Sequence, residues 1–192
     1  KGYLEDPAIC LSGIGDVKSD KVPFQVGQFE SGIEIDNDIT NLYLEGGGGG
    51  NMHESYEMAL YFLAHCTSCD AFEKRGEKGY AFIIGDEELQ PHLDRNEAKL
   101  VFGDECNLES NVPMETLMAS VLEKWELYHI RPNMTCHVND EKYMARWKDL
   151  LNERVLFLDD PNGISELIAS TIGILEDIAD WSSIPPDLPR EG

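Results

Sequence analysis

Oxygen-bearing side chains follow a run of five glycines and close a later apolar segment. Residues 46–50 are all glycine and lead into a polar stretch, while Asp86 follows the apolar residues 80–84. A glycine run that enters a helix lets the backbone approach a ligand and leaves N–H groups free there. Oxygen donors suit a hard cation such as Mg²⁺. The predicted metal ligands are Asp86, Glu54, Ser55 and Asn51, and the predicted binding residues beside them are Gly48, Gly49, Gly50, Asp16 and Glu87.

Other catalytic motifs are missing from the sequence. No Gly-Lys-Ser/Thr follows the glycines, and no lysine occurs between them and Lys74, so a P-loop is excluded. A single Cys-x-x-Cys at Cys66 and Cys69 ends a predicted helix, which favours structural thiols over zinc or redox chemistry. No Gly-x-Ser-x-Gly occurs. The sequence therefore predicts a binding protein and not an enzyme, with a flexible loop and a turn aspartate as the alternative interpretation of residues 46–50 and Asp86.

The charge of the chain limits its partners. Its 192 residues include 37 acidic and 15 basic side chains, a formal net charge of −22. Such a chain is repelled by nucleic acid and anionic membranes and attracts cations and basic protein surfaces. Five cysteines, an odd number, and a start without a signal segment predict a cytoplasmic chain with mostly free thiols. The absence of an initiator Met also suggests that Lys1 is not the natural start.

Strand-like and helix-like segments alternate along the chain. Strands are predicted over residues 8–16, 24–29, 80–84, 134–138 and 155–158. Helices are predicted to begin near Asn51, Pro113, Asp140 and Asn162, with Trp125 on the second helix. Residues 31–50 and 87–111 are predicted loops, and Asp159 and Asp160 are interpreted as turn residues.

This order of elements predicts an α/β fold. We expect a doubly wound, mostly parallel, Rossmann-like sheet with helices on both faces and one antiparallel edge strand at residues 24–29. A single domain is predicted over residues 1–182, followed by a Pro-rich tail at 183–192. Ligands of such sheets bind at the carboxyl ends of the strands, where Asp16 and Asp86 are expected.

The same segments resemble a known family. An edge strand, the glycine loop, a helix reading Glu57-Met58-Ala59-Leu60 and a strand ending in Ile84-Gly85-Asp86-Glu87 are similar to the von Willebrand factor A (vWA) fold over residues 8–180. The resemblance implies a metal-ion-dependent adhesion site in which Asp86 matches the family's third metal-binding loop. The family's second-loop threonine falls within residues 51–55, where no Thr occurs, and its Asp-x-Ser-x-Ser motif and central first strand are absent. We therefore expect an upstream strand–helix unit, or completion of the sheet by another chain.

The resemblance implies a protein–protein interaction module. A partner carboxylate would complete Mg²⁺ coordination at Asp86, and residues 16–50 and 87–111 would form the partner surface. The alternatives are a Mg²⁺-dependent Rossmann-like phosphohydrolase, which would use Asp16 and Asp86, and a structural subunit that binds no metal.

Overall fold

The computed structural model describes residues 4, 7–45, 54–133 and 142–178. The chain divides into two compact units that interleave along the sequence. Unit 1 combines residues 1–5 and 79–87 with everything from Trp125 onward, and unit 2 combines residues 6–78 and 88–124.

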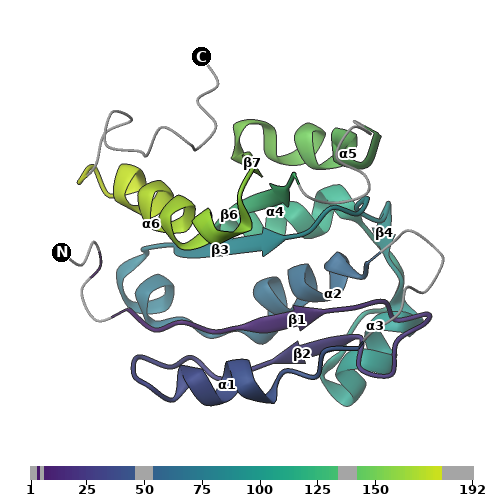
Figure 1. Ribbon diagram of the computed structural model, residues 1–192. Coiled ribbons are helices and arrows are strands. Elements are labelled where there is room, and N and C mark those ends of the chain that lie inside the picture. The colour runs from purple at the N-terminus through teal and green to yellow at the C-terminus, as the bar shows by residue number, and fades with distance from the viewer. Residues whose placement is uncertain (1–3, 5–6, 46–53, 134–141, 179–192) are drawn as a thin grey trace. The chain divides into compact units, whose positions relative to one another are not determined.

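Unit 1 is built on a parallel sheet. Its elements are β3 (Gly79–Ile84), β6 (Trp125–Pro132), α5 (Lys142–Leu151), β7 (Val155–Leu158) and α6 (Ile164–Leu175) (Figure 1). The strand order is β3-β6-β7, and both pairs are parallel, with Gly79 opposite Trp125 and His129 opposite Val155. Within the described residues, β3 therefore lies at an edge of this three-stranded sheet.

Helices contact both faces of this sheet. Side chains alternate between the faces of a strand, and on one face of β6 His129 stacks on Trp147 of α5, with ring centroids 4.0 Å apart. On the opposite face, Ile130 packs with Leu158 and with Leu167 of α6. The prediction of a mixed α/β fold with parallel strands is confirmed, and the prediction of strands at residues 80–84 and 155–158 is confirmed with it.

Unit 2 is mainly helical and carries two short antiparallel strand pairs. Its elements are β1 (Ser12–Ile14), β2 (Phe24–Val26), α1 (Ile35–Asn41), α2 (Tyr56–Tyr61), β4 (His92–Leu93), α3 (Arg95–Phe102), β5 (Val112–Pro113) and α4 (Met114–Lys124). A π-helical turn, Phe62–Cys66, continues α2. Every residue of α2 is buried, and α4 covers it with buried Leu117, Met118 and Val121. The predicted strands at residues 8–16 and 24–29 are found as the short strands β1 and β2, which pair antiparallel with each other. Among the described residues they form a two-stranded sheet of their own, so the prediction that residues 24–29 are an edge strand of the parallel sheet is wrong.

Several predictions about the elements are wrong. Residues 87–111, predicted as a loop, contain α3, and residues 31–50 contain α1. Trp125, predicted on a helix, begins β6, because α4 ends at Lys124. Asn162 does not cap the last helix; Gly163 precedes α6, and the Asp160 side chain accepts hydrogen bonds from Asn162.

Other predictions lie outside the described residues. These are the strand at residues 134–138, the cap Asp140 and the tail at 183–192. Among the residues that the structure describes, none of the helices combines the length and apolar character needed to span a membrane. The single-domain prediction over residues 1–182 stays a prediction.

Candidate functional site

The loop after β1 is closed by the carboxylate of Asp16. Its Oδ1 accepts a hydrogen bond from the backbone N–H of Lys18 at 3.0 Å, and its Oδ2 accepts one from Ser19 Oγ at 2.9 Å. The Asp16 N–H donates in turn to Asp20 Oδ2 at 2.8 Å. An Asp that hydrogen-bonds the backbone two residues ahead forms an Asx turn. Asp16 is therefore a buried residue that organises residues 16–20.

Ser55 ties this loop to the start of α2. Its backbone N–H donates to Gly15 O at 2.9 Å, and its Oγ accepts from the Val17 N–H at 3.0 Å. Ser55 precedes α2 but makes no side-chain hydrogen bond to that helix's first N–H groups. The hydroxyl instead joins residues that are 38 positions apart in sequence. The structure thus brings together the predicted residues Asp16, Glu54 and Ser55 in unit 2.

Glu57 is a buried carboxyl group beside this contact. It is only 2 % exposed, and its Oε2 has no hydrogen-bond partner among the described residues. Burial raises the pKa of Glu57 to about 7, and the charge of Glu97 acts in the same direction. A hydrogen bond from the Glu57 backbone N–H, the charge of Lys18 and a hydrogen bond from Ser55 act the other way and keep the pKa of Glu57 from rising further. A carboxyl group in this setting takes up and releases its proton near neutral pH.

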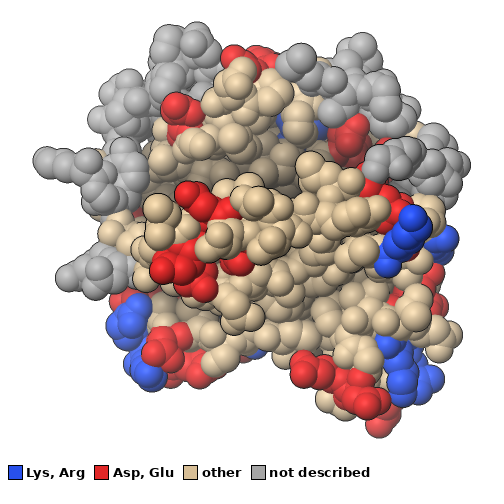
Figure 2. Space-filling view, turned by 60° about the horizontal axis from the view of Figure 1, so that its bottom comes forward, with Lys and Arg blue, Asp and Glu red and all other residues tan. Residues whose placement is uncertain are grey.

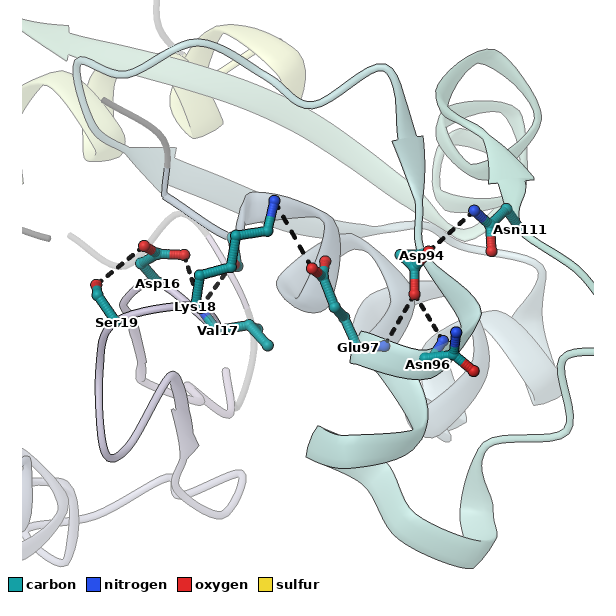
Figure 3. Close-up of polar contacts among 9 residues, drawn as sticks. Asp16, Val17, Lys18, Ser19, Asp94, Asn96, Glu97 and Asn111 are labelled. Carbon is teal, nitrogen blue, oxygen red and sulfur yellow. Dashed lines mark hydrogen bonds and ion pairs between the residues drawn. The ribbon is translucent and has the colours of Figure 1, made fainter. Parts of the chain in front are cut away.

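The start of α3 carries the next polar cluster (Figure 3). Asp94 caps α3 by accepting hydrogen bonds from the N–H groups of Asn96 and Glu97, and its Oδ2 accepts a bond from Asn111 Nδ2. The hydrogen bond from the Glu97 N–H lowers the pKa of Asp94. Lys18 Nζ lies 3.7 Å from Glu97 Oε1, so the loop after β1 also reaches α3. The loop is therefore held by the starts of two helices.

Asp86 and Glu87 belong to unit 1, where they follow β3. The Gly85 N–H continues the parallel ladder by donating to Ile130 O at 3.1 Å, which places Asp86 just beyond the carboxyl end of β3. Glu87 O accepts a hydrogen bond from Trp147 Nε1 at 3.3 Å. Both acidic side chains are partly buried. The predicted place of Asp86 at a strand end is confirmed.

The neighbouring strand ends carry polar residues too. Asn133 follows β6, and its side-chain amide donates to the carboxylate of Asp159, which follows β7. Asp160 accepts from the Asn162 N–H at 2.9 Å and from Asn162 Nδ2 at 2.8 Å. The turn role predicted for Asp160 is thus confirmed, and Asp159 serves mainly to hold Asn133.

The predicted Mg²⁺ site can be tested against these donors. Both oxygens of Asp16 and the Oγ of Ser55 already accept hydrogen bonds from the loop they organise. In the described part of the chain, no three His, Cys, Asp or Glu side chains gather where they could hold a metal ion. Asn51 and Gly48, Gly49 and Gly50 lie outside the described residues. Asp86 belongs to unit 1 and Glu54 and Ser55 belong to unit 2, so the predicted Mg²⁺ site stays a prediction.

The cysteine pair shows no sign of activation. Cys66 and Cys69 are free thiols, as are Cys10 and Cys106. Burial, together with the charge of Glu105, raises the pKa of the Cys66 thiol, which leaves it protonated and weakly nucleophilic at neutral pH. The interpretation as structural thiols is favoured by this environment.

The most unusual surface of unit 2 was not singled out by the sequence motifs. Helix α1 buries none of its residues. Residues 9–44 hold most of the large apolar side chains that are exposed in the described chain: Ile9, Val22, Val26, Phe29, Ile33, Ile39, Tyr43 and Leu44. Exposed apolar side chains that gather on one segment are typical of interaction sites. We call residues 9–44 the apolar segment.

Comparison of the chain with protein-family models, with curated proteins and with solved structures gave no match. Glu57 and the apolar segment are the two features that the motif search missed. Two sequence signals could have revealed them. Glu57 is a charged residue within the otherwise apolar stretch at residues 56–61, and the apolar segment places apolar residues among acidic ones.

Proposed function

We propose that this chain is a protein–protein interaction module of the vWA-like type. The observation that carries the proposal is the exposed apolar segment, where Ile33 is 78 % and Leu44 is 88 % exposed. Leaving such side chains in water forgoes about 1.5–3 kcal/mol each relative to burial. A partner that covers them would recover part of that free energy. The segment lies within residues 16–50 for most of its length, as the sequence predicts for the partner surface.

The architecture supports the same proposal. The parallel pairs β3–β6 and β6–β7, with α5 and α6 contacting opposite faces of β6, are compatible with a doubly wound, vWA-like sheet. In open sheets of this kind, ligands bind beyond the carboxyl ends of the strands. Asp86 and Glu87 follow β3 at that end. We include the doubly wound fold in the proposal.

The predicted Mg²⁺ route is kept separate. Binding through the apolar segment does not require a metal, since its side chains are apolar. The prediction that Asp86 supports divalent-dependent binding stays a prediction, and the same assay tests it. No contact of the described residues favours the phosphohydrolase alternative, in which Asp16 would face a substrate, because both Asp16 oxygens organise their own loop.

Affinity capture with matched variants tests the proposal. The full chain, an Ile33→Ser/Leu44→Ser variant and an Ile178→Ser control would be immobilised at equal density, and proteins captured from cell extract would be quantified by mass spectrometry. Ile178 is a suitable control because it is 55 % exposed after α6, outside the apolar segment and outside residues 87–111. We expect one or a few proteins to be depleted at least fivefold on the double variant only. Equal capture by all three chains would refute the proposal.

Two further arms address Asp86. Capture is repeated with Mg²⁺, with EDTA, and with Asp86→Ala. Loss of capture in EDTA and in the variant would establish the metal route predicted from the sequence. Capture that survives both conditions would exclude that route and leave the apolar segment as the binding surface.

A further inference from the structure

The apolar segment is folded as one continuous piece. The backbone of Tyr43 is held by the side chain of Gln25 in β2, whose Oε1 accepts from the Tyr43 N–H at 2.8 Å and whose Nε2 donates to Tyr43 O at 3.0 Å. Ile9 and Glu30 exchange two backbone hydrogen bonds of 2.8 and 2.9 Å. The first contact joins β2 to the residues that follow α1, and the second extends the pairing of β1 with β2. The backbone of the apolar segment is therefore held together by its own hydrogen bonds.

Helix α1 contributes no fully buried residue to the core. It has seven residues, none of them buried. Isolated helices of this length are marginal in water, and most helix stability in proteins comes from packing an apolar face. Ile39 lies within α1 and is 54 % exposed. A partner that packs on this helix would supply the contacts that the described chain does not.

The charge of this region is one-sided. Between Val22 and Glu73 the sequence has no Lys or Arg at all. Five carboxyl groups lie in and around α1: Glu30, Glu34, Asp36, Asp38 and Glu45. Figure 2 shows acidic side chains in patches among uncharged residues, with basic ones mainly toward the margins of that view. An approaching surface with negative charge would be repelled.

Charge complementarity decides between the candidate occupants. A second copy of this chain, with a net charge of −22, would bring like charges together. A segment with alternating Lys or Arg and apolar residues would pair its cations with Glu34 and Asp36 and place its apolar side chains on Ile33, Ile39 and Leu44. Electrostatic complementarity of this kind speeds association and selects the partner, while the apolar contacts give affinity.

We propose that the apolar segment binds a basic, amphipathic segment of a partner protein. This inference rests on the proposed interaction function and names the chemistry of its partner.

Synthetic peptides test the partner chemistry directly. Three peptides of equal length would be used: an amphipathic Leu/Lys peptide, a Leu/Glu peptide with reversed charge, and a Ser/Lys peptide that keeps the charge without apolar side chains. Binding to the full chain would be measured by fluorescence anisotropy at 150 mM NaCl, roughly the physiological ionic strength at which exposed charges are screened beyond about 8 Å. We expect the Leu/Lys peptide to bind at least tenfold more tightly than either of the other two.

Variants locate the peptide on the chain. Ile39→Ser/Leu44→Ser and Glu34→Lys/Asp36→Lys should each weaken Leu/Lys binding at least tenfold, and Ile178→Ser should leave it unchanged. All substituted side chains are on the surface or next to it, and far-UV circular dichroism checks that each variant keeps its fold. Equal binding of the Ser/Lys peptide, or equal binding by the variants, would show unspecific charge attraction and overturn the inference.

The two proposals can fail separately. If the capture experiment finds a partner that needs Ile33 and Leu44 but the Leu/Lys peptide does not bind, the interaction function stands and the basic partner is wrong. If the peptide binds at the apolar segment and a captured partner does not need that segment, the interaction function as proposed is wrong.

Discussion

Replacing Glu57 by Gln should remove a pH-dependent loss of stability from unit 2. Glu57 is 2 % exposed, and burial raises its pKa from 4.5 to about 7. Each tenfold change in proton affinity corresponds to about 1.4 kcal/mol. Ionising the buried carboxyl group therefore lowers the free energy of unfolding by about 3 kcal/mol. Gln keeps the size of the side chain and its ability to contact Ser55, but it cannot ionise.

The sign follows from the direction of the pKa shift. Because the pKa of Glu57 is higher in the folded state than in the unfolded state, the folded state binds the proton more tightly. The resulting stability is fully present below pH 4.5 and is lost as the pH rises through about 7. Between pH 4.5 and 8, the free energy of unfolding of the native chain should therefore fall relative to that of Glu57→Gln by about 3 kcal/mol.

Urea unfolding followed by far-UV circular dichroism, at pH values from 4.5 to 8, gives this difference. Comparing the two chains at each pH cancels other titrations, notably that of His129 in unit 1. Burial, with the charge of Arg131 acting the same way, lowers the pKa of His129 from 6.5 to about 3, so its contribution to stability is lost as the pH falls through that range. Glu123→Gln, at an exposed position on α4, controls for loss of a charge.

A difference that changes by less than about 1 kcal/mol over this range would refute the reasoning. So would a carbon-13 NMR titration that finds the Glu57 carboxyl half-protonated near pH 4.5.

Two further substitutions test local contacts. Ser55→Ala removes the acceptor of the Val17 N–H, 3.0 Å away. It should lower the free energy of unfolding by about 1–3 kcal/mol, because a buried donor loses its partner. Urea unfolding measures this change, and Ser110→Ala, at an exposed site, should change the free energy of unfolding little. Gly79→Ala would place its Cβ against the ring of the buried Trp125 and should cost about 1–3 kcal/mol. Thermal unfolding checks this, with Gly13→Ala as the control because its Cβ would meet side chains at an ordinary 3.4 Å; equal melting temperatures for the two variants would contradict the predicted clash.

The sequence predicted the strands that are uninterrupted runs of apolar residues. Residues 80–84 are a short apolar run stopped by Gly-Asp, and they form most of β3. The position of Asp86 followed from the end of that run. Strand β6 was missed because its buried residues include His129 and Arg131, which are not residue types expected in a hydrophobic core. In addition, Trp125 fits the helical spacing of α4.

Helix α3 could have been predicted. Asp94 and Glu97 are spaced as an N-cap and an N3 acidic residue, which is a recognised helix-start signal, but the polar composition of residues 87–111 favoured a loop. The pairing of Ser55 with Val17 could not have been predicted, because 38 residues separate them and neither belongs to a recognisable motif. Burial of Glu57 likewise depends on tertiary packing, since a single Glu in a helix is normally assigned to the solvent-exposed face of that helix.

The interleaving of the two units limits how the chain can be cut. Unit 1 takes one strand from residues 79–87 and the rest from Trp125 onward, with residues 88–124 assigned to unit 2 between them. A chain truncated after Lys124 would keep β3 but lose β6, its only partner strand among the described residues. A chain that begins at Trp125 would keep β6 and β7 but lose β3.

No single break in the backbone therefore yields either unit intact. Residues 88–124 are an insertion into unit 1 whose two ends leave from β3 and return at β6. Isolating unit 1 would require excising this insertion and rejoining Glu87 to Trp125 through a new linker. A truncation from the N-terminus that ends within residues 6–78 removes part of unit 2, and one from the C-terminus removes part of unit 1. Point substitutions are therefore the appropriate tool for mapping a binding surface on this protein.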